Sequence, residues 1–161
     1  MLLSDLLNTT SKNHRKIRVE GISFDSRKIK KNYIFFAIQG KKTSGTKYVK
    51  EAISAGASAI VSEKKVNFKI NKIPLFLVKD SRKNLSEACT KFYKKKPQNI
   101  IAVTGTNGKS SVANFFYQIL SLNKIPAATI GTLGIISKNY NKKTKLTSID
   151  PVSLHKNLKI L

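Results

Sequence analysis

Residues 99–122 read NIIAVTGTNGKSSVANFFYQILSL and predict a strand, a glycine-rich loop and a helix in direct succession. The strand is expected at 99–103, the loop at 104–111 and an amphipathic helix at 110–122. Glycines in such a loop let the backbone approach phosphate oxygens, and the following helix directs its free N-terminal amides and positive dipole end at them. We therefore predict a nucleotide-phosphate-binding loop.

The residue types in this loop indicate its chemistry. Lys109 is the predicted catalytic residue because its ammonium group would reach the β- and γ-phosphates of ATP, and the Ser110 hydroxyl is the predicted ligand of Mg²⁺. Val103 stands where the general P-loop pattern has glycine, so the loop has the shorter form TGTNGK[ST]. The predicted ATP-binding residues are Gly105, Thr106, Asn107, Gly108, Lys109, Ser110 and Ser111.

The rest of the chain alternates strand and helix patterns, which predicts an α/β fold with mainly parallel sheets. Asp150 and Pro151 are typical of a helix start, with Asp as N-cap and Pro at the first helical position. The other expected strands are 21–24, 33–38, 59–61, 75–78 and 127–130. A helix is expected at 47–55, closed by Gly56. Another is expected to start at Asp80 or Ser81 and to stop before Pro97.

Two domains are expected, 1–97 and 98–161, because the pattern restarts after Pro97. The second has too few elements for a complete doubly wound sheet and no stop signal before Leu161, so we expect it to be truncated. Apolar periodicity predicts that Phe35, Phe36, Cys89, Phe115 and Phe116 are core residues, and that Val112, Ile119 and Leu120 share the buried side of helix 110–122.

The formal net charge is +23, from 31 Lys+Arg against 8 Asp+Glu. The lysines are spread along the chain in pairs and triplets, without a basic arm or interleaved aromatics, so we expect no nucleic-acid partner but a preference for anionic small molecules. No apolar run is long enough to span a bilayer, and the N-terminus is not a secretory signal. With one cysteine and no metal-ligand spacing, we expect a cytoplasmic monomer.

The loop resembles that of the Mur ligase and folylpolyglutamate synthetase superfamily, which makes amide bonds at the expense of ATP. The segments ISFDSRKIKKNYIFFAIQG (22–40) and AISAGASAIV (52–61) resemble the UDP-sugar-binding domain of Mur ligases. The segments GTLG (131–134) and LTSIDPVSLHKNL (146–158) are most similar to the branch that adds the third residue of the peptidoglycan stem peptide. Ser110-Ser111 replaces the usual Thr-Thr, and Ser148-Ile149 replaces the usual Thr-Pro.

This resemblance implies an N-terminal Rossmann-like UDP-sugar-binding domain followed by the start of a P-loop-type central ATP-binding domain. The implied reaction activates the D-glutamyl carboxylate of UDP-N-acetylmuramoyl-L-alanyl-D-glutamate as an acyl phosphate, which the amine of a diamino acid then attacks. Meso-diaminopimelate is the expected diamino acid, with lysine as the alternative. Arg27 is expected either to hold the turn at Asp25 or to face the pyrophosphate. The implied substrate-binding residues are Phe24, Ser26, Lys41, Lys42, Thr43, Thr147 and Ser148.

Three alternatives remain at this point: a generic P-loop NTPase or kinase, another Mur ligase such as the dipeptide-adding enzyme, and a nucleic-acid-binding module. The resemblance covers about the first third of such a ligase. The remaining parts are expected beyond Leu161, and we expect the chain alone to show no ligase turnover.

Overall fold

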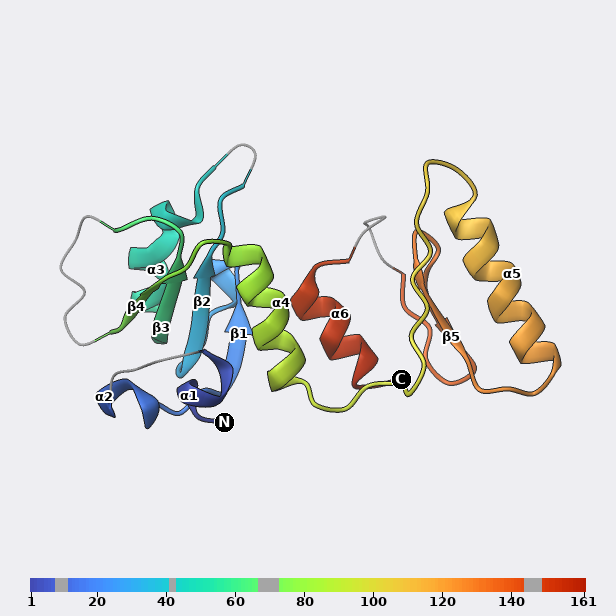
Figure 1. Cartoon of the computed structure of the whole chain (residues 1–161), viewed down its shortest axis with the longest axis horizontal. Coiled ribbons are helices and arrows are strands. Elements are labelled where there is room, and N and C mark those ends of the chain that lie inside the picture. The colour runs from blue at the N-terminus through green and yellow to red at the C-terminus, as the bar shows by residue number, and fades with distance from the viewer. Residues whose placement is uncertain (8–11, 41–42, 67–72, 144–148) are drawn as a thin grey trace. The chain divides into compact units, whose positions relative to one another are not determined.

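The computed structural model describes residues 1–7, 12–40, 43–66, 73–143 and 149–161. The chain forms two compact units, Met1–Lys94 and Lys95–Leu161, each with its own helices and strands. The mixed α/β composition expected from the sequence is confirmed (Figure 1). Among the described residues, no helix is long and apolar enough to cross a bilayer.

The first unit is built on a parallel sheet of four strands that lie in the order of the chain. Each strand was expected from an apolar run in the sequence, and all four predictions are confirmed to within a few residues at their ends. The strands are β1 (Gly21–Ser23), β2 (Tyr33–Ala37), β3 (Ala57–Ser62) and β4 (Leu75–Leu77).

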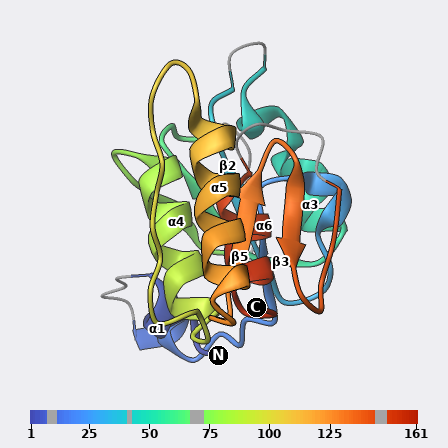
Figure 2. The same cartoon turned by 90° about the vertical axis from the view of Figure 1, so that its right-hand side faces the viewer.

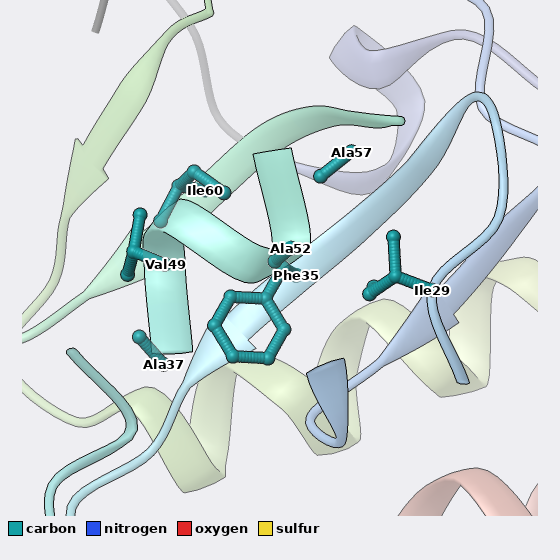
Figure 3. Close-up of a cluster of buried hydrophobic side chains, with 7 residues drawn as sticks. All are labelled: Ile29, Phe35, Ala37, Val49, Ala52, Ala57 and Ile60. Carbon is teal, nitrogen blue, oxygen red and sulfur yellow. The ribbon is translucent and has the colours of Figure 1, made fainter. Parts of the chain in front are cut away.

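Strand β2 is buried on both faces because helices cover the sheet on both sides (Figure 1). Phe35 and Ala37 contact the helix α3 (Val49–Ser54), which contributes Val49 and Ala52 to the same apolar cluster (Figure 3). The alternate residues of β2 face the opposite way, as strand geometry requires, and there helix α4 (Ser81–Phe92) packs against β1 and β2. A strand covered on both faces reads as a continuous apolar run, which explains the sequence YIFFA.

The predicted core residues of this unit are confirmed, since Phe35, Phe36 and Cys89 are fully buried. Helix α4 begins as predicted at an Asp80 cap, whose Oδ1 accepts the Lys83 amide at 2.9 Å. The remaining elements of the unit are α1 (Leu3–Leu6), α2 (Lys12–Arg15) and the 3-10 turns η1 (Ser26–Lys28) and η2 (Gly45–Tyr48).

The described residues of the second unit form two helices and a two-stranded sheet. The predicted helices are confirmed as α5 and α6, and the strand expected at 127–130 is confirmed as β5. Its partner β6 pairs with it antiparallel, so this pair is the exception to the mainly parallel arrangement that was expected. The four elements are α5 (Lys109–Leu122), β5 (Ala128–Gly131), β6 (Gly134–Ser137) and α6 (Pro151–Leu158).

Two predictions for the second unit are wrong. Residues 99–103 form no strand, because in the described part of the chain they pair with no neighbouring strand and a lone strand leaves its backbone groups unsatisfied. Phe115 and Phe116 are not core residues, since they are 60% and 45% exposed. Helix α5 has the amphipathic spacing of a buried helix, but no residue of it is buried.

A carboxylate joins the end of β3 to the start of α4. Glu63 Oε1 accepts hydrogen bonds from the Ser81 amide at 2.9 Å and from the Ser81 hydroxyl at 2.8 Å. The backbone and side-chain hydrogen bonds from Ser81 lower the pKa of Glu63 below its usual value of 4.5. Hydrogen bonds to the charged form favour it, so this carboxylate stabilises the packing of α4 on the sheet more strongly while it is ionised.

We predict that Glu63→Gln lowers the free energy of unfolding by about 1 kcal/mol or less at neutral pH, because the charge-assisted bonds are lost but the site is exposed to solvent. Since the folded-state pKa is lowered, the difference between the two proteins is full above pH 4.5 and shrinks as the pH falls through the folded-state pKa. Urea unfolding at a series of pH values measures it. Glu87→Gln, on the exposed side of α4, is the matched control. A difference that stays constant down to about pH 3, which is below the usual glutamate pKa, would contradict the assignment of this stabilisation to ionised Glu63.

Candidate functional site

The carboxyl ends of parallel strands meet at one edge of a sheet, and that edge is where ligands bind in open α/β folds. In the first unit this edge carries the residues that follow β1, namely Phe24, Asp25 and Ser26. The adjacent strand β2 leads at the same edge into the loop that ends at Thr43. The parallel topology therefore places Phe24, Ser26 and the described end of the loop after β2 at the same edge of the sheet.

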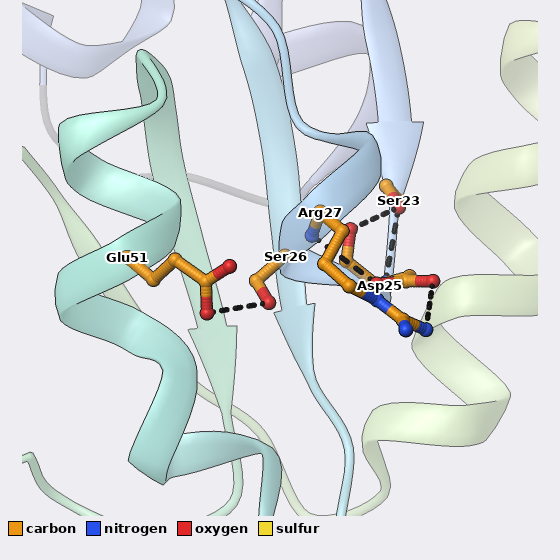
Figure 4. A network of polar contacts seen from close by, with 5 residues as sticks. All are labelled: Ser23, Asp25, Ser26, Arg27 and Glu51. Carbon is orange, nitrogen blue, oxygen red and sulfur yellow. Dashed lines mark hydrogen bonds and ion pairs between the residues drawn. The ribbon is translucent and has the colours of Figure 1, made fainter.

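The Asp25 turn is closed by its own side chains (Figure 4). The Ser23 hydroxyl accepts the Asp25 amide at 3.0 Å and donates to the Asp25 carbonyl at 2.9 Å. Asp25 Oδ1 accepts the Arg27 amide at 3.1 Å, so Asp25 is also the N-cap of η1. The guanidinium of Arg27 completes a two-point ion pair, with Nε to Oδ1 and Nη2 to Oδ2 both at 2.9 Å.

This ion pair changes the titration of both partners. The side-chain hydrogen bond from Arg27 lowers the pKa of Asp25 below its usual value of 3.8, and the same bond raises the pKa of Arg27. Of the two roles expected for Arg27, the structure shows the one in which it holds the turn.

Ser26 lies behind the turn and is only 7% exposed. Its hydroxyl donates to Glu51 Oε2 at 3.0 Å, across to helix α3 (Figure 4). Phe24 lies on the other side of Asp25 and is 38% exposed, so part of it is accessible to a ligand. Sequence reasoning did not single out Glu51, because only the packing of α3 beside η1 brings it to Ser26.

The loop after β2 is closed by backbone hydrogen bonds. The Gly40 amide donates to the Thr43 carbonyl and the Gly45 amide to the Ile38 carbonyl, both at 2.9 Å. Thr43 is exposed at this loop. Lys41 and Lys42, which were predicted to line the same site, lie outside the described residues. The start of α4 also reaches the loop, since Arg82 Nη2 donates to the Gln39 carbonyl at 3.3 Å, a contact that the sequence did not predict.

In the second unit, the predicted phosphate loop leads directly into α5. Gly105 and Gly108 have φ angles of 148° and 74°, in the region that favours glycine, and a Cβ at Gly108 would meet open space. The first amides of any α-helix have no intrahelical acceptor. Gly108 is the N-cap of α5 and has no side chain that could accept from them. Such a loop fits a phosphate, because its donors and the helix dipole favour an anion.

The two chemically important side chains of the loop are both placed at its exposed surface. Lys109 Nζ donates to the Gly105 carbonyl at 2.5 Å and to the Thr106 carbonyl at 3.1 Å, so the ammonium group is held over the loop. The Ser110 hydroxyl donates to Thr132 Oγ1 at 3.3 Å. Thr132 follows β5 in the segment GTLG, and its side chain was not among the predicted site residues.

The remaining predicted site residues precede Asp150 in the sequence. Thr147 and Ser148 are outside the described residues. Asp150 acts as the predicted N-cap, since its Oδ1 accepts the Ser153 amide at 2.9 Å. Across the described ranges, no three His, Cys, Asp or Glu side chains gather where they could hold a metal ion.

The first unit has the parallel sheet of an open α/β fold, and the second has a glycine loop at the start of a helix that fits a phosphate. The comparison with family models is specific. The model described as "Mur ligase family, catalytic domain" matches residues 18–106, and the model described as "Mur ligase middle domain" matches residues 103–161. The chain belongs to the Mur ligase family.

Similar curated proteins carry one name, UDP-N-acetylmuramoyl-L-alanyl-D-glutamate--2,6-diaminopimelate ligase. The protein of Rhizobium meliloti (strain 1021) is 41% identical over 140 residues, which is 87% of this chain and 29% of that protein. The protein of Rickettsia prowazekii (strain Madrid E) is 42% identical over 154 residues, 93% of this chain and 31% of that protein. The chain thus spans about a third of the length of the relatives it matches.

Solved structures agree with this result. A structure of a UDP-N-acetylmuramoyl-L-alanyl-D-glutamate--2,6-diaminopimelate ligase matches with a TM-score of 0.79 and 26% identity, over 99% of this chain and 33% of that one. A MurF ligase from Thermotoga maritima, solved in complex with ADP, matches with a TM-score of 0.51 and 26% identity, over 66% of this chain and 24% of that one.

We predict that Arg27→Ala raises the pKa of Asp25 toward 3.8, because the hydrogen bond that lowers it most is lost. An NMR titration of the Asp25 carboxyl carbon measures the change. Lys28→Ala is the matched control, since Lys28 is the weakest of the groups that lower this pKa. Equal shifts in the two variants would show that general positive charge, rather than the two-point ion pair, sets the pKa.

Proposed function

We propose that this protein is an ATP-dependent ligase that adds 2,6-diaminopimelate to UDP-N-acetylmuramoyl-L-alanyl-D-glutamate, a step of peptidoglycan synthesis. The observation that carries the proposal is the 41–42% identity to ligases of that name, which extends across both units. We assign residues 1–97 to the UDP-substrate-binding domain and 98–161 to the central ATP-binding domain. ATP and UDP-linked substrates imply a cytoplasmic location.

The loop at the start of α5 is the proposed ATP site. Lys109 would neutralise charge on the β- and γ-phosphates as a point charge, and would exchange its carbonyl contacts to Gly105 and Thr106 for phosphate oxygens. The amides at the start of α5 would donate to the same phosphates. The proposed ATP-binding residues remain Gly105, Thr106, Asn107, Gly108, Lys109, Ser110 and Ser111.

Ser110 is the proposed magnesium ligand in this site. Bound Mg²⁺ would withdraw negative charge from the phosphates of ATP while the γ-phosphoryl group passes to the substrate carboxylate. Without a protein nucleophile, the chain's own contribution is to orient the phosphates and to supply the positive charge of Lys109. Thr132, whose hydroxyl meets that of Ser110, would hold the Ser110 side chain in place.

The carboxyl edge of the first unit is the proposed site for the UDP end of the substrate. Phe24 offers an exposed ring, Ser26 a hydroxyl, and Thr43 an exposed hydroxyl on the adjoining loop. Lys41 and Lys42 would add positive charge for the pyrophosphate, and Thr147 and Ser148 would bind the sugar or peptide part. These four stay predictions from the family resemblance.

We predict that the 161-residue chain binds ATP and UDP at two different sites. A single substitution should therefore weaken the binding of one ligand and leave the other unchanged. Lys109→Ala should weaken ATP binding by about tenfold or more, because a charged phosphate contact is lost, and leave UDP binding unchanged. Isothermal titration measures both affinities. Lys138→Ala, an exposed lysine of the same unit, controls for the loss of one positive charge.

The outcomes distinguish the two halves of the proposal. Equal losses of ATP affinity in the two lysine variants would contradict a specific role for Lys109. ATP binding without any UDP binding at millimolar concentration would favour a generic NTPase. Tighter binding of UDP-N-acetylmuramoyl-L-alanyl-D-glutamate than of UDP would support the substrate assignment.

A further inference from the structure

We propose that Glu51 determines base specificity at the substrate site by fixing the Ser26 hydroxyl as a hydrogen-bond acceptor, so that the site selects a ligand N–H and thereby uracil over cytosine. The inference rests on the proposed function and adds a residue that neither the family resemblance nor the sequence pattern indicated. It depends on which partner donates in the Ser26–Glu51 hydrogen bond, and not simply on the presence of a serine.

The direction of the Ser26–Glu51 bond follows from its two partners. An ionised carboxylate can only accept, so the single hydroxyl proton of Ser26 must point to Glu51 Oε2, 3.0 Å away. The Ser26 oxygen keeps lone pairs, which can accept but no longer offer a proton. Because Ser26 is only 7% exposed, few competing water contacts remain for that oxygen.

The carboxylate at this position is unusual for the composition of the chain. Only 8 Asp+Glu stand against 31 Lys+Arg, and Glu51 accepts the hydroxyl of Ser26 while its charge also helps to raise the pKa of Arg27. Arg27, the nearest guanidinium on η1, gives both of its side-chain hydrogen bonds to Asp25. The side-chain hydrogen bond of Glu51 in this network goes to Ser26 (Figure 4).

An acceptor-only hydroxyl beside two carboxylates disfavours a phosphate, which is itself an acceptor and an anion. The donors of UDP are the imide N–H of uracil and the ribose hydroxyls. Phe24 favours the base, because an exposed aromatic ring two residues from Ser26 can stack on it. Cytosine presents a lone pair where uracil presents its N–H, so two acceptors would face each other and stay unpaired, which weakens the binding of cytosine.

The test compares the affinities of the 161-residue chain for UDP, CDP and deoxyuridine diphosphate by isothermal titration. We expect the unmodified chain to prefer UDP over CDP by about tenfold or more, and to bind deoxyuridine diphosphate like UDP. Glu51→Ala frees the Ser26 proton to donate to cytosine, so the UDP-to-CDP preference should fall several-fold. Ser26→Ala should reduce the same preference by weakening UDP alone.

Two further variants guard against a purely structural effect. Glu51→Gln keeps the size of the side chain but can donate as well as accept, so it should reduce the preference to an intermediate value. Glu87→Ala removes an exposed carboxylate from α4 and should keep the full preference. Thermal unfolding of each variant confirms that it folds.

Contrary results fall into three distinct classes. If Glu51→Ala weakens UDP and CDP by the same factor, Glu51 only tethers η1 to α3, and the inference fails while the proposed function stands. Loss of deoxyuridine diphosphate binding, with CDP bound as well as UDP, would assign Ser26 to the ribose and overturn the base assignment. If the unmodified chain binds no UDP, both the inference and the proposed substrate site fail.

Discussion

The first unit depends on the burial of β2 from both sides. Phe35 and Phe36 point to opposite faces of the sheet and are both fully buried, one beside α3 and the other on the α4 side. With both faces covered, a parallel sheet can present ligand-binding groups only at its edges, and the loops at the carboxyl edge are free to vary without disturbing the core. The site at Phe24 and Ser26 is a consequence of that constraint.

The carboxyl edge also gathers the scarce acidic residues of a strongly basic chain. Asp25 closes the first turn, Glu51 takes the Ser26 proton, and Glu63 joins β3 to α4. Each carboxylate accepts from a hydroxyl, an amide or a guanidinium nearby, so each orders a specific group instead of merely offsetting positive charge. The excess lysines elsewhere leave the surface attractive to anions such as nucleotides.

The predictions from sequence succeeded where a local rule governs the structure. The apolar runs located all the strands of the first sheet, and the caps at Asp80 and Asp150 located two helix starts. They failed at 99–103 and at Phe115, where the outcome depends on a neighbour. An apolar segment becomes a strand only if another strand pairs with it, and an apolar helix face is buried only if something packs on it.

The sequence by itself indicated the four strands of the first sheet, the glycine loop that leads into α5 and the resemblance to the family, because glycine positions, caps and apolar periodicity act over a few residues. The role of Arg27 was decided by the folded turn, where its guanidinium meets Asp25 rather than a ligand. The Ser26–Glu51 bond was decided only by the tertiary structure, since 25 residues separate the partners. Packing of α3 beside η1 brings them together, and no local pattern in the chain encodes that contact.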